Sequence, residues 1–300
     1  MARQKQFEYE GHYVDRTSKY RIKQTVLRVV YHLFTFVLAI VMLYPIIWMV
    51  FSSLKPTTEI FKTAAQLILP GQTTFENYVN GFRGFAGTSF SVFFKNSFII
   101  SALSTIGAVI SSAVVAYGFA RMNFKGKGFW FSCMLVAMML PFQIIMIPQY
   151  LLFNTLGWVG TYLPLILPQW FGQGFLIFLN VQFIRGIPYD LDEAAMIDGC
   201  SVYGIFLRII IPLIVPSLVT SAIFSFMWRW DDFMSALIFL NKPVTYPVAY
   251  ALKLFADPSA SSDYGAMFAM STLSLIPIFT IFLTMQRYLV EGIASTGIKG

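Results

Sequence analysis

Charged residues are scarce in this sequence, and their scarcity excludes a soluble enzyme. Asp, Glu, Lys and Arg make up only 12% of the 300 residues, whereas 57% of the residues are hydrophobic and 17% are aromatic. The mean hydropathy is +0.68. A folded chain with this balance would expose too much apolar surface to water. The protein is therefore expected to reside in a membrane.

Residues that build catalytic or metal sites are equally few. The sequence has only two histidines, His12 in the first 28 residues and His32 in an apolar stretch, which gives metal binding and acid–base catalysis little support. Cys133 lies within an apolar stretch and Cys200 outside one, which favours two free thiols. No G-x-x-x-x-G-K-[ST] phosphate loop occurs. The sequence therefore offers no phosphate-binding loop of this kind.

Five long stretches carry no charge, and each can cross a membrane. A helix needs ~20 residues to span ~30 Å of hydrocarbon. The longest stretch, 128–184, is long enough for two crossings, with a turn near Asn154, Gly157 and Gly160. The ten-residue alternation of membrane β-strands is absent. The sequence therefore predicts an all-α integral membrane protein with six transmembrane helices, near 29–52, 96–118, 129–152, 161–183, 209–235 and 268–286.

The positive charges predict which side of the membrane each segment occupies. Residues 1–28 form a basic tail with seven Lys and Arg, so the amino terminus is expected in the cytoplasm. With six spans, both termini and the segments 119–128 and 184–208 are cytoplasmic, and they hold 14 of the 21 Lys and Arg residues. The net charge of +7 thus reflects membrane orientation. Nucleic-acid binding is a poor alternative because no basic patch alternates with polar aromatic surface.

The cytoplasmic segment 184–208 breaks this charge rule because four acids stand against two Arg. Its sequence predicts two short helices: Asp190 or Asp192 caps the first, Gly199 ends it in a left-handed conformation, and Ser201 caps the second. The product is a small acidic helix–turn–helix knob. On composition alone, an ordinary solvated loop whose acids cap helices is the favoured interpretation.

The same segment closely resembles the EAA motif of the membrane subunits of ABC importers, which is E-A-A, a glycine four residues beyond the second Ala, and a downstream I-x-L-P. The matching residues are Glu193-Ala194-Ala195, Asp198-Gly199 and Ile209-Ile210-Ile211-Pro212, with Ile where Leu is usual. The resemblance implies a coupling helix seated in a cleft of a cytoplasmic ATPase subunit. By this resemblance, Glu193 is the charged contact with the ATPase, and the small Ala194 and Ala195 allow close approach to it. Gly199 forms the turn, next to the acidic Asp198.

Other short motifs extend the resemblance to the maltose-type (MalG-like) carbohydrate permeases, from about residue 40 to the last residue. They include Tyr44-Pro45, Ala120-Arg121, Leu156-Gly157-Trp158, Trp230-Asp231-Asp232-Phe233, Gln286-Arg287-Tyr288 and Gly297-Ile298-Lys299-Gly300. Asp231 stands where Asn is common.

This resemblance implies the type I (MetI/MalG-like) ABC importer permease fold over residues 29–300, in a bacterial cytoplasmic (inner) membrane. The chain would be a non-catalytic permease, and one half of a path for a carbohydrate. The implied partners are a homologous second permease, two ATP-binding subunits, an extracytoplasmic solute-binding protein and the lipid bilayer. This chain would hold no cofactor, because ATP and Mg belong to the ATPase subunits.

Two groups of residues are candidates for the substrate path. Gln169, Gln173 and Asn180 lie within roughly 40° of one another on a continuous helix and predict one polar stripe. Amides that hold membrane helices together are an equally good interpretation. Trp228, Trp230 and Asp231 fall near the outer end of the fifth predicted span, where charges of helix ends also reach the interface. The family resemblance favours a role for these three beside the path.

Two alternatives stay open: a permease of the same class for a non-sugar solute, and an ion-coupled secondary transporter. The second predicts ionisable residues at mid-membrane, which the spans lack apart from His32. Among sugars, oligosaccharides are favoured because maltose-type permeases mostly carry them. The sequences of residues 181–185 and 287–292 also resemble those of permeases from systems that import acidic, uronate-containing oligosaccharides.

Overall fold

The computed structural model describes residues 2–67, 73–256 and 263–297, and side chains over 23–67, 73–256 and 263–289. All regular structure in these ranges is helical, which confirms the predicted fold class. The long helices are α1 (Ala2–Ser52), α3 (Phe90–Arg121), α11 (Val215–Trp230) and α14 (Tyr264–Gly297). The shorter elements are α2 (Glu76–Arg83), α4 (Lys127–Met138), α5 (Phe142–Thr155), α6 (Leu163–Ile166), η1 (Leu167–Phe171), α7 (Gly174–Gly186), α8 (Asp190–Ile197), α9 (Val202–Ile205), η2 (Phe206–Ile210), α10 (Ile211–Leu213), α12 (Phe233–Phe239), η3 (Pro243–Thr245) and α13 (Val248–Phe255).

Three described helices are long and apolar enough to cross a membrane unbroken: Lys23–Ser52 within α1, Phe90–Arg121 (α3), and Tyr264–Leu289 within α14. Two further crossings are possible if bent pairs of helices count as one span each. The pair α4 and α5 bends by 99°, and the pair Val202–Leu213 and Val215–Trp230 bends by 75°. Residues 2–28, which belong to the expected separate tail, are part of the continuous helix α1.

Three of the six predicted spans are not single helices. The span predicted near 209–235 divides into η2, α10, α11 and the start of α12, with the 75° bend between Leu213 and Val215. The segment predicted near 129–152 breaks before Pro141, whose ring disfavours helical backbone in the residue before it. The segment predicted near 161–183 divides into α6, the 3₁₀-helix η1 and α7, with Gly172 at φ +89° between the last two. Pro164 and Pro168 stand in the first turns of α6 and η1, and because proline has no backbone N–H, it favours a new start at each of these positions.

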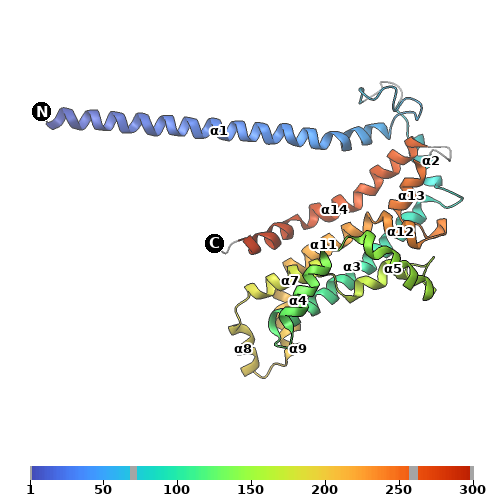
Figure 1. Ribbon diagram of the computed structural model, residues 1–300. Helices are drawn as coiled ribbons and strands as arrows, with labels where there is room; N and C mark the ends of the chain where they lie inside the picture. Colours follow the sequence, from blue (N-terminus) through green and yellow to red (C-terminus); the bar gives the residue numbers. More distant parts are fainter. Residues whose placement is uncertain (1, 68–72, 257–262, 298–300) are drawn as a thin grey trace.

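α3 forms the centre of the bundle and joins its two ends. It contributes Phe90 and Phe93 to a cluster with α13 and α14, Ile100 to a middle cluster, and Ala116 and Tyr117 to a third cluster with α7 and α9. Figure 1 shows α2, α12 and α13 at one end of the bundle, with α8 and α9 at the other. The N-terminal end of α1 and the C-terminal end of α14 point away from the end that holds α2.

Serine hydroxyls of α3 satisfy the backbone groups that the broken segment leaves free. Ser104 Oγ donates to the Leu165 carbonyl (3.2 Å), and Ser111 Oγ donates to the Gln169 carbonyl (3.3 Å). The Gln173 N–H donates to Ser112 Oγ (3.1 Å). Non-helical backbone at membrane depth is tolerated where protein groups satisfy it, so the broken segment depends on α3.

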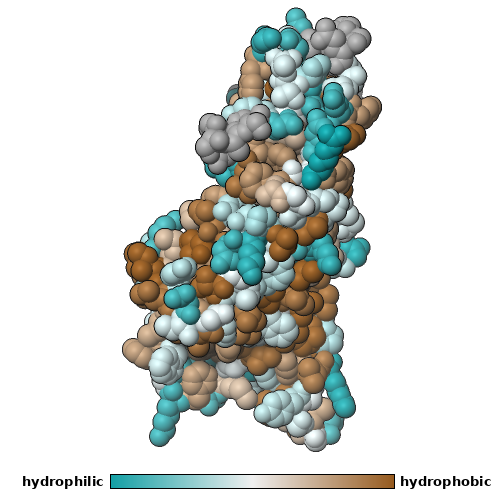
Figure 2. Space-filling model, turned by 90° about the vertical axis from the view of Figure 1, so that its right-hand side faces the viewer, coloured by the Kyte–Doolittle hydropathy of each residue, from teal (hydrophilic) through white to brown (hydrophobic). Residues whose placement is uncertain are grey.

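α1 leans away from the other helices (Figure 1), and its apolar side chains are largely uncovered. It meets the bundle at its C-terminal end, where Trp48 packs edge-on against Phe268 with ring centroids 5.3 Å apart. Trp48 Nε1 also donates to the Ala64 carbonyl (2.9 Å). Figure 2 shows the end of the molecule near α2, with hydrophilic residues gathered toward the top of the view and hydrophobic residues over much of its lower part.

Candidate functional site

The hairpin formed by α8 and α9, residues 190–205, projects from the end of the bundle opposite α2. Gly199 adopts φ +80°, and its N–H donates to the Met196 carbonyl (3.0 Å). Ser201 Oγ accepts from the Gly204 N–H (3.2 Å) and caps α9. The predicted left-handed stop and the predicted serine cap are therefore both confirmed. The predicted acidic cap is wrong, because the residue before α8 is Tyr189 and it makes no side-chain cap.

The five predicted coupling residues lie on two faces of the hairpin, one exposed and one packed against the bundle. Glu193, Ala194, Asp198 and Gly199 are exposed. Ala195 is only 7% exposed and packs inward, into the apolar cluster with Tyr117 and Ile205. Ala195 therefore lets α8 approach its own bundle, and of the two alanines only Ala194 can approach a partner in this conformation.

The sequence did not single out the exposed apolar side chains of this hairpin. Ile197 is 86% exposed and Tyr203 is 79% exposed. These two side chains lie on the same hairpin as the exposed acids Glu193 and Asp198. The exposed surface of the hairpin thus combines apolar and acidic residues. Their positions beside the acids are the signal that could have found them.

Asp192 faces the bundle and is 2% exposed, although it lies beside the exposed Glu193. Its Oδ2 lies 2.7 Å from Nε of Arg121, whose side chain is 9% exposed. The contact has the distance of an ion pair without the geometry of a hydrogen bond. Arg121 Nη2 also donates to the Ile187 carbonyl (2.8 Å), and its guanidinium lies over the Tyr189 ring, 5.5 Å from the centroid. A buried ion pair therefore joins α3 to the hairpin.

The predicted polar stripe of Gln169, Gln173 and Asn180 does not form, because the helix is broken between η1 and α7. Asn180 is fully buried and bonds across to α11: Ser217 Oγ donates to its Oδ1 (2.7 Å) and its Nδ2 donates to Ser221 Oγ (3.2 Å). This contact holds two helices together. Gln169 and Gln173 are half-buried near the break, where Gln173 Oε1 has no hydrogen-bond partner among the described residues.

The three candidates at the end of α11 point in different directions. Trp230 is 2% exposed, donates from Nε1 to the Ser274 carbonyl (3.2 Å) and stacks on Phe226 at 5.6 Å. It packs the core and does not border a path in this conformation. Asp231 is exposed. Trp228 is 39% exposed and stacks on Phe224, with centroids 5.7 Å apart.

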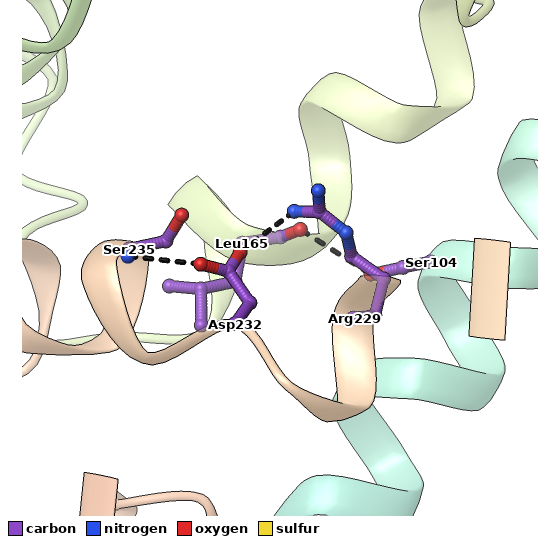
Figure 3. A network of polar contacts seen from close by, with 5 residues as sticks. All are labelled: Ser104, Leu165, Arg229, Asp232 and Ser235. Carbon is purple, nitrogen blue, oxygen red and sulfur yellow. Dashed lines mark hydrogen bonds and ion pairs between the residues drawn. The ribbon is translucent and has the colours of Figure 1, made fainter. Parts of the chain in front are cut away.

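A polar network fixes the corner that follows Trp230 (Figure 3). Asp232 Oδ2 pairs with Nη1 of Arg229 (2.9 Å), and Asp232 Oδ1 accepts from the Ser235 N–H (3.0 Å) at the start of α12. Arg229 and Asp232 are therefore satisfied by each other, which agrees with helix-end charges. Nearby, the Ser104–Leu165 hydrogen bond ties α3 to α6.

No group of three or more His, Cys, Asp and Glu residues comes within metal-binding reach in the part of the chain that the structure describes. Cys133 and Cys200 are both free, which confirms the prediction of free thiols.

Comparisons with known proteins agree on one family. Residues 108–295 match the family described as "Binding-protein-dependent transport system inner membrane component". The chain is 38% identical to "Probable ABC transporter permease protein YurM" of Bacillus subtilis (strain 168), over 89% of this chain and 87% of that protein. It is 33% identical to "Arabinooligosaccharides transport system permease protein AraQ" of Halalkalibacterium halodurans, over 88% of this chain and 93% of that protein.

A solved structure has the same fold. The crystal structure of a bacterial ABC transporter involved in the import of the acidic polysaccharide alginate contains a chain that superposes with a TM-score of 0.76. The sequences are 21% identical, and the match covers 88% of this chain and 96% of the other. The fold is therefore that of an ABC importer permease.

Proposed function

The chain belongs to the family of binding-protein-dependent transport system inner membrane components, and from this membership we propose that it forms half of the translocation path of an ATP-driven carbohydrate importer. Family membership argues against the ion-coupled secondary transporter. ATP hydrolysis resides in separate subunits, which also hold ATP and Mg. The protein lies in a bacterial cytoplasmic membrane with both termini in the cytoplasm, an orientation supported by its basic segments.

The exposed hairpin carries the proposal of coupling to an ATPase. Glu193, Ala194, Asp198 and Gly199 are exposed together with the apolar Ile197, at the end of the bundle opposite α2. A small helical knob with an apolar tip and acidic flanks fits a groove lined by basic residues. ATP-driven closure of two ATPase subunits pushes the knob and switches the path between inward-open and outward-open states.

The uncovered α1 supports a second permease subunit as partner. Its residues 23–45 are all exposed, and the apolar side chains among them need either lipid or protein against them. In an importer with two homologous permeases, α1 of one subunit packs on the other. An extracytoplasmic solute-binding protein delivers the substrate at the end that carries α2, α12 and α13.

An oligosaccharide is the substrate class that the comparisons favour, because AraQ is named for arabinooligosaccharide transport. Uronate-containing oligosaccharides are a further candidate. They are supported by the likeness to the alginate transporter and by the sequences of residues 181–185 and 287–292. Trp228 is an accessible path candidate because it is 39% exposed, and exposed aromatic faces can stack on sugar rings. Gln169, Gln173 and Asp231 supply polar groups, whereas Asn180 and Trp230 support the packing around them.

The test uses the complete complex, reconstituted in liposomes with its second permease, ATPase subunits and binding protein. Neutral oligosaccharides, uronate oligosaccharides and a short peptide are compared for stimulation of ATP hydrolysis, and uptake of the stimulating solute is measured. Glu193→Ala should reduce uptake about tenfold or more while the complex still assembles, because the charged contact with the ATPase is lost. Gly199→Pro should act in the same direction, because proline cannot adopt φ +80°.

Lys125→Ala is the matched control, since Lys125 is exposed in the loop between α3 and α4 and outside the hairpin. Full uptake by both hairpin variants would count against coupling through this hairpin. If the peptide stimulates ATP hydrolysis and neither class of oligosaccharide does, the substrate is a non-sugar solute and the proposed carbohydrate is wrong.

A further inference from the structure

One face of the last two turns of α3 contacts both arms of the hairpin. Arg121 contacts the first arm through Asp192 and the Ile187 carbonyl. Tyr117, one turn earlier on the same face, donates from its hydroxyl to the Val202 carbonyl (3.2 Å) at the start of α9. Its ring packs on Phe206, with centroids 4.9 Å apart. The hairpin is thus held at two points by a helix that is distant from it in sequence.

The ion pair has no substitute among the described residues. Both carboxylate oxygens of Asp192 are buried and accept no hydrogen bond from these residues, and Arg121 is the cation at ion-pair distance. A buried carboxylate without its cation is strongly disfavoured. The geometry therefore ties the position of α8 to that of α3.

The covalent route from the hairpin into the fifth span is indirect. α9 runs into the π-helix η2, and the chain then bends by 75° between Leu213 and Val215. π-helical turns and bends of this kind lie where a helix can change shape. α3, in contrast, is an unbroken helix of 32 residues that reaches all three apolar clusters.

We propose that Arg121, Asp192 and Tyr117 clamp the hairpin to α3, so that α3 receives the push of the ATPase and carries it to the opposite end of the bundle. This inference rests on the proposed function of the hairpin. The three residues are positioning residues: they contact neither substrate nor the ATPase in this account. The clamp passes the movement of the hairpin to α3 directly, without requiring the chain to carry it through the bend between Leu213 and Val215.

The test compares Asp192→Asn, Arg121→Gln and the double variant in the reconstituted complex, with co-purification of the other subunits as the measure of assembly. Each single variant should lower the solute transported per ATP hydrolysed about tenfold, while basal ATP hydrolysis stays within about twofold of the unmodified complex. Because the two residues act as a unit, the double variant should be no worse than either single variant. The charge swap Arg121→Asp with Asp192→Arg should recover part of the coupling.

A second readout measures position directly. Spin labels at Asp190→Cys and Lys125→Cys, both exposed, report the distance between α8 and the end of α3 once Cys133 and Cys200 are replaced by Ser. The distance distribution should be narrow in the unmodified chain and broad in Asp192→Asn. Tyr117→Phe, which removes one hydroxyl, should broaden it less.

The outcomes separate the clamp from the function on which it rests. Suppose that Glu193→Ala uncouples transport, but Asp192→Asn keeps normal coupling and a narrow distance distribution. This result would overturn the clamp and leave the proposed function of the hairpin standing. Additive losses in the double variant would also overturn it, because the residues would then act independently. Full transport by both Glu193→Ala and Asp192→Asn would contradict the proposed coupling through the hairpin and the clamp together.

Discussion

At the scale of single residues, side chains of the same type and neighbouring positions differ in burial and therefore in role. Glu193 and Asp192 are adjacent acids, but the first is exposed and the second is 2% exposed beside Arg121. The motif was sufficient to find Glu193, Ala194 and Gly199. The ion pair was out of reach, because its partners are 71 positions apart and only the packing of α3 against α8 brings them together.

Asn180 allows a test of its packing role against a role in the path. Asn180→Leu removes the partner of Ser217 and Ser221, and each buried hydroxyl left unsatisfied costs ~1–3 kcal/mol. We expect a lower unfolding temperature of the purified chain in detergent. Asn154→Leu, at an exposed position, is the control and should change it little. An unchanged unfolding temperature with a selective loss of transport would instead place Asn180 in the substrate path.

At the scale of elements, proline shows why the helix boundaries were hard to predict. Pro45 and Pro277 lie inside the continuous helices α1 and α14. Pro141 stands at a 99° bend, and Pro164 and Pro168 start the short α6 and η1. Neighbouring groups, such as the serines of α3, decide which break is tolerated. Hydropathy located the apolar segments, but it contains no information about these neighbours.

Close packing of α3 against η1 makes a second prediction. A Cβ on Gly107 would lie 2.3 Å from Cδ1 of Trp170, whereas a Cβ on Gly118 would meet nothing within 4 Å. Gly107→Ala should therefore destabilise the bundle by ~1–3 kcal/mol through overpacking. Gly118→Ala, on the same helix, should be neutral or stabilising by up to ~1 kcal/mol. Thermal unfolding in detergent compares the two, and equal behaviour would show that Trp170 can move aside at little cost.

At the scale of the whole molecule, the bundle is incomplete around α1. The membrane stretch of α1 is uncovered by the rest of the chain, while that of α3 is 39% buried. The sequence predicted both helices as equivalent spans, since the same apolar composition suits lipid and protein neighbours. Burial of one and exposure of the other depend on tertiary packing, which the apolar composition does not record.

Cross-linking tests whether a second permease covers α1. Met42→Cys, at a position that is 70% exposed, should form a cross-linked product with the second permease subunit in the assembled complex. Cys133→Ser and Cys200→Ser remove the two native thiols first. The same chain expressed without its partners should give no such product. Absence of the product from the complex at positions around the whole circumference of α1 would mean that lipid alone covers the helix.

The broken fourth segment also has a consequence for biosynthesis. α7 has 13 residues, or ~20 Å of helix, too short to cross the hydrocarbon by itself. Its preceding backbone is satisfied by hydroxyls of α3, which the ribosome has made some 60 residues earlier. We therefore expect this segment to insert next to α3 and not as an independent helix. On this expectation α3 stays near the exit of the insertion machinery until the later segment arrives.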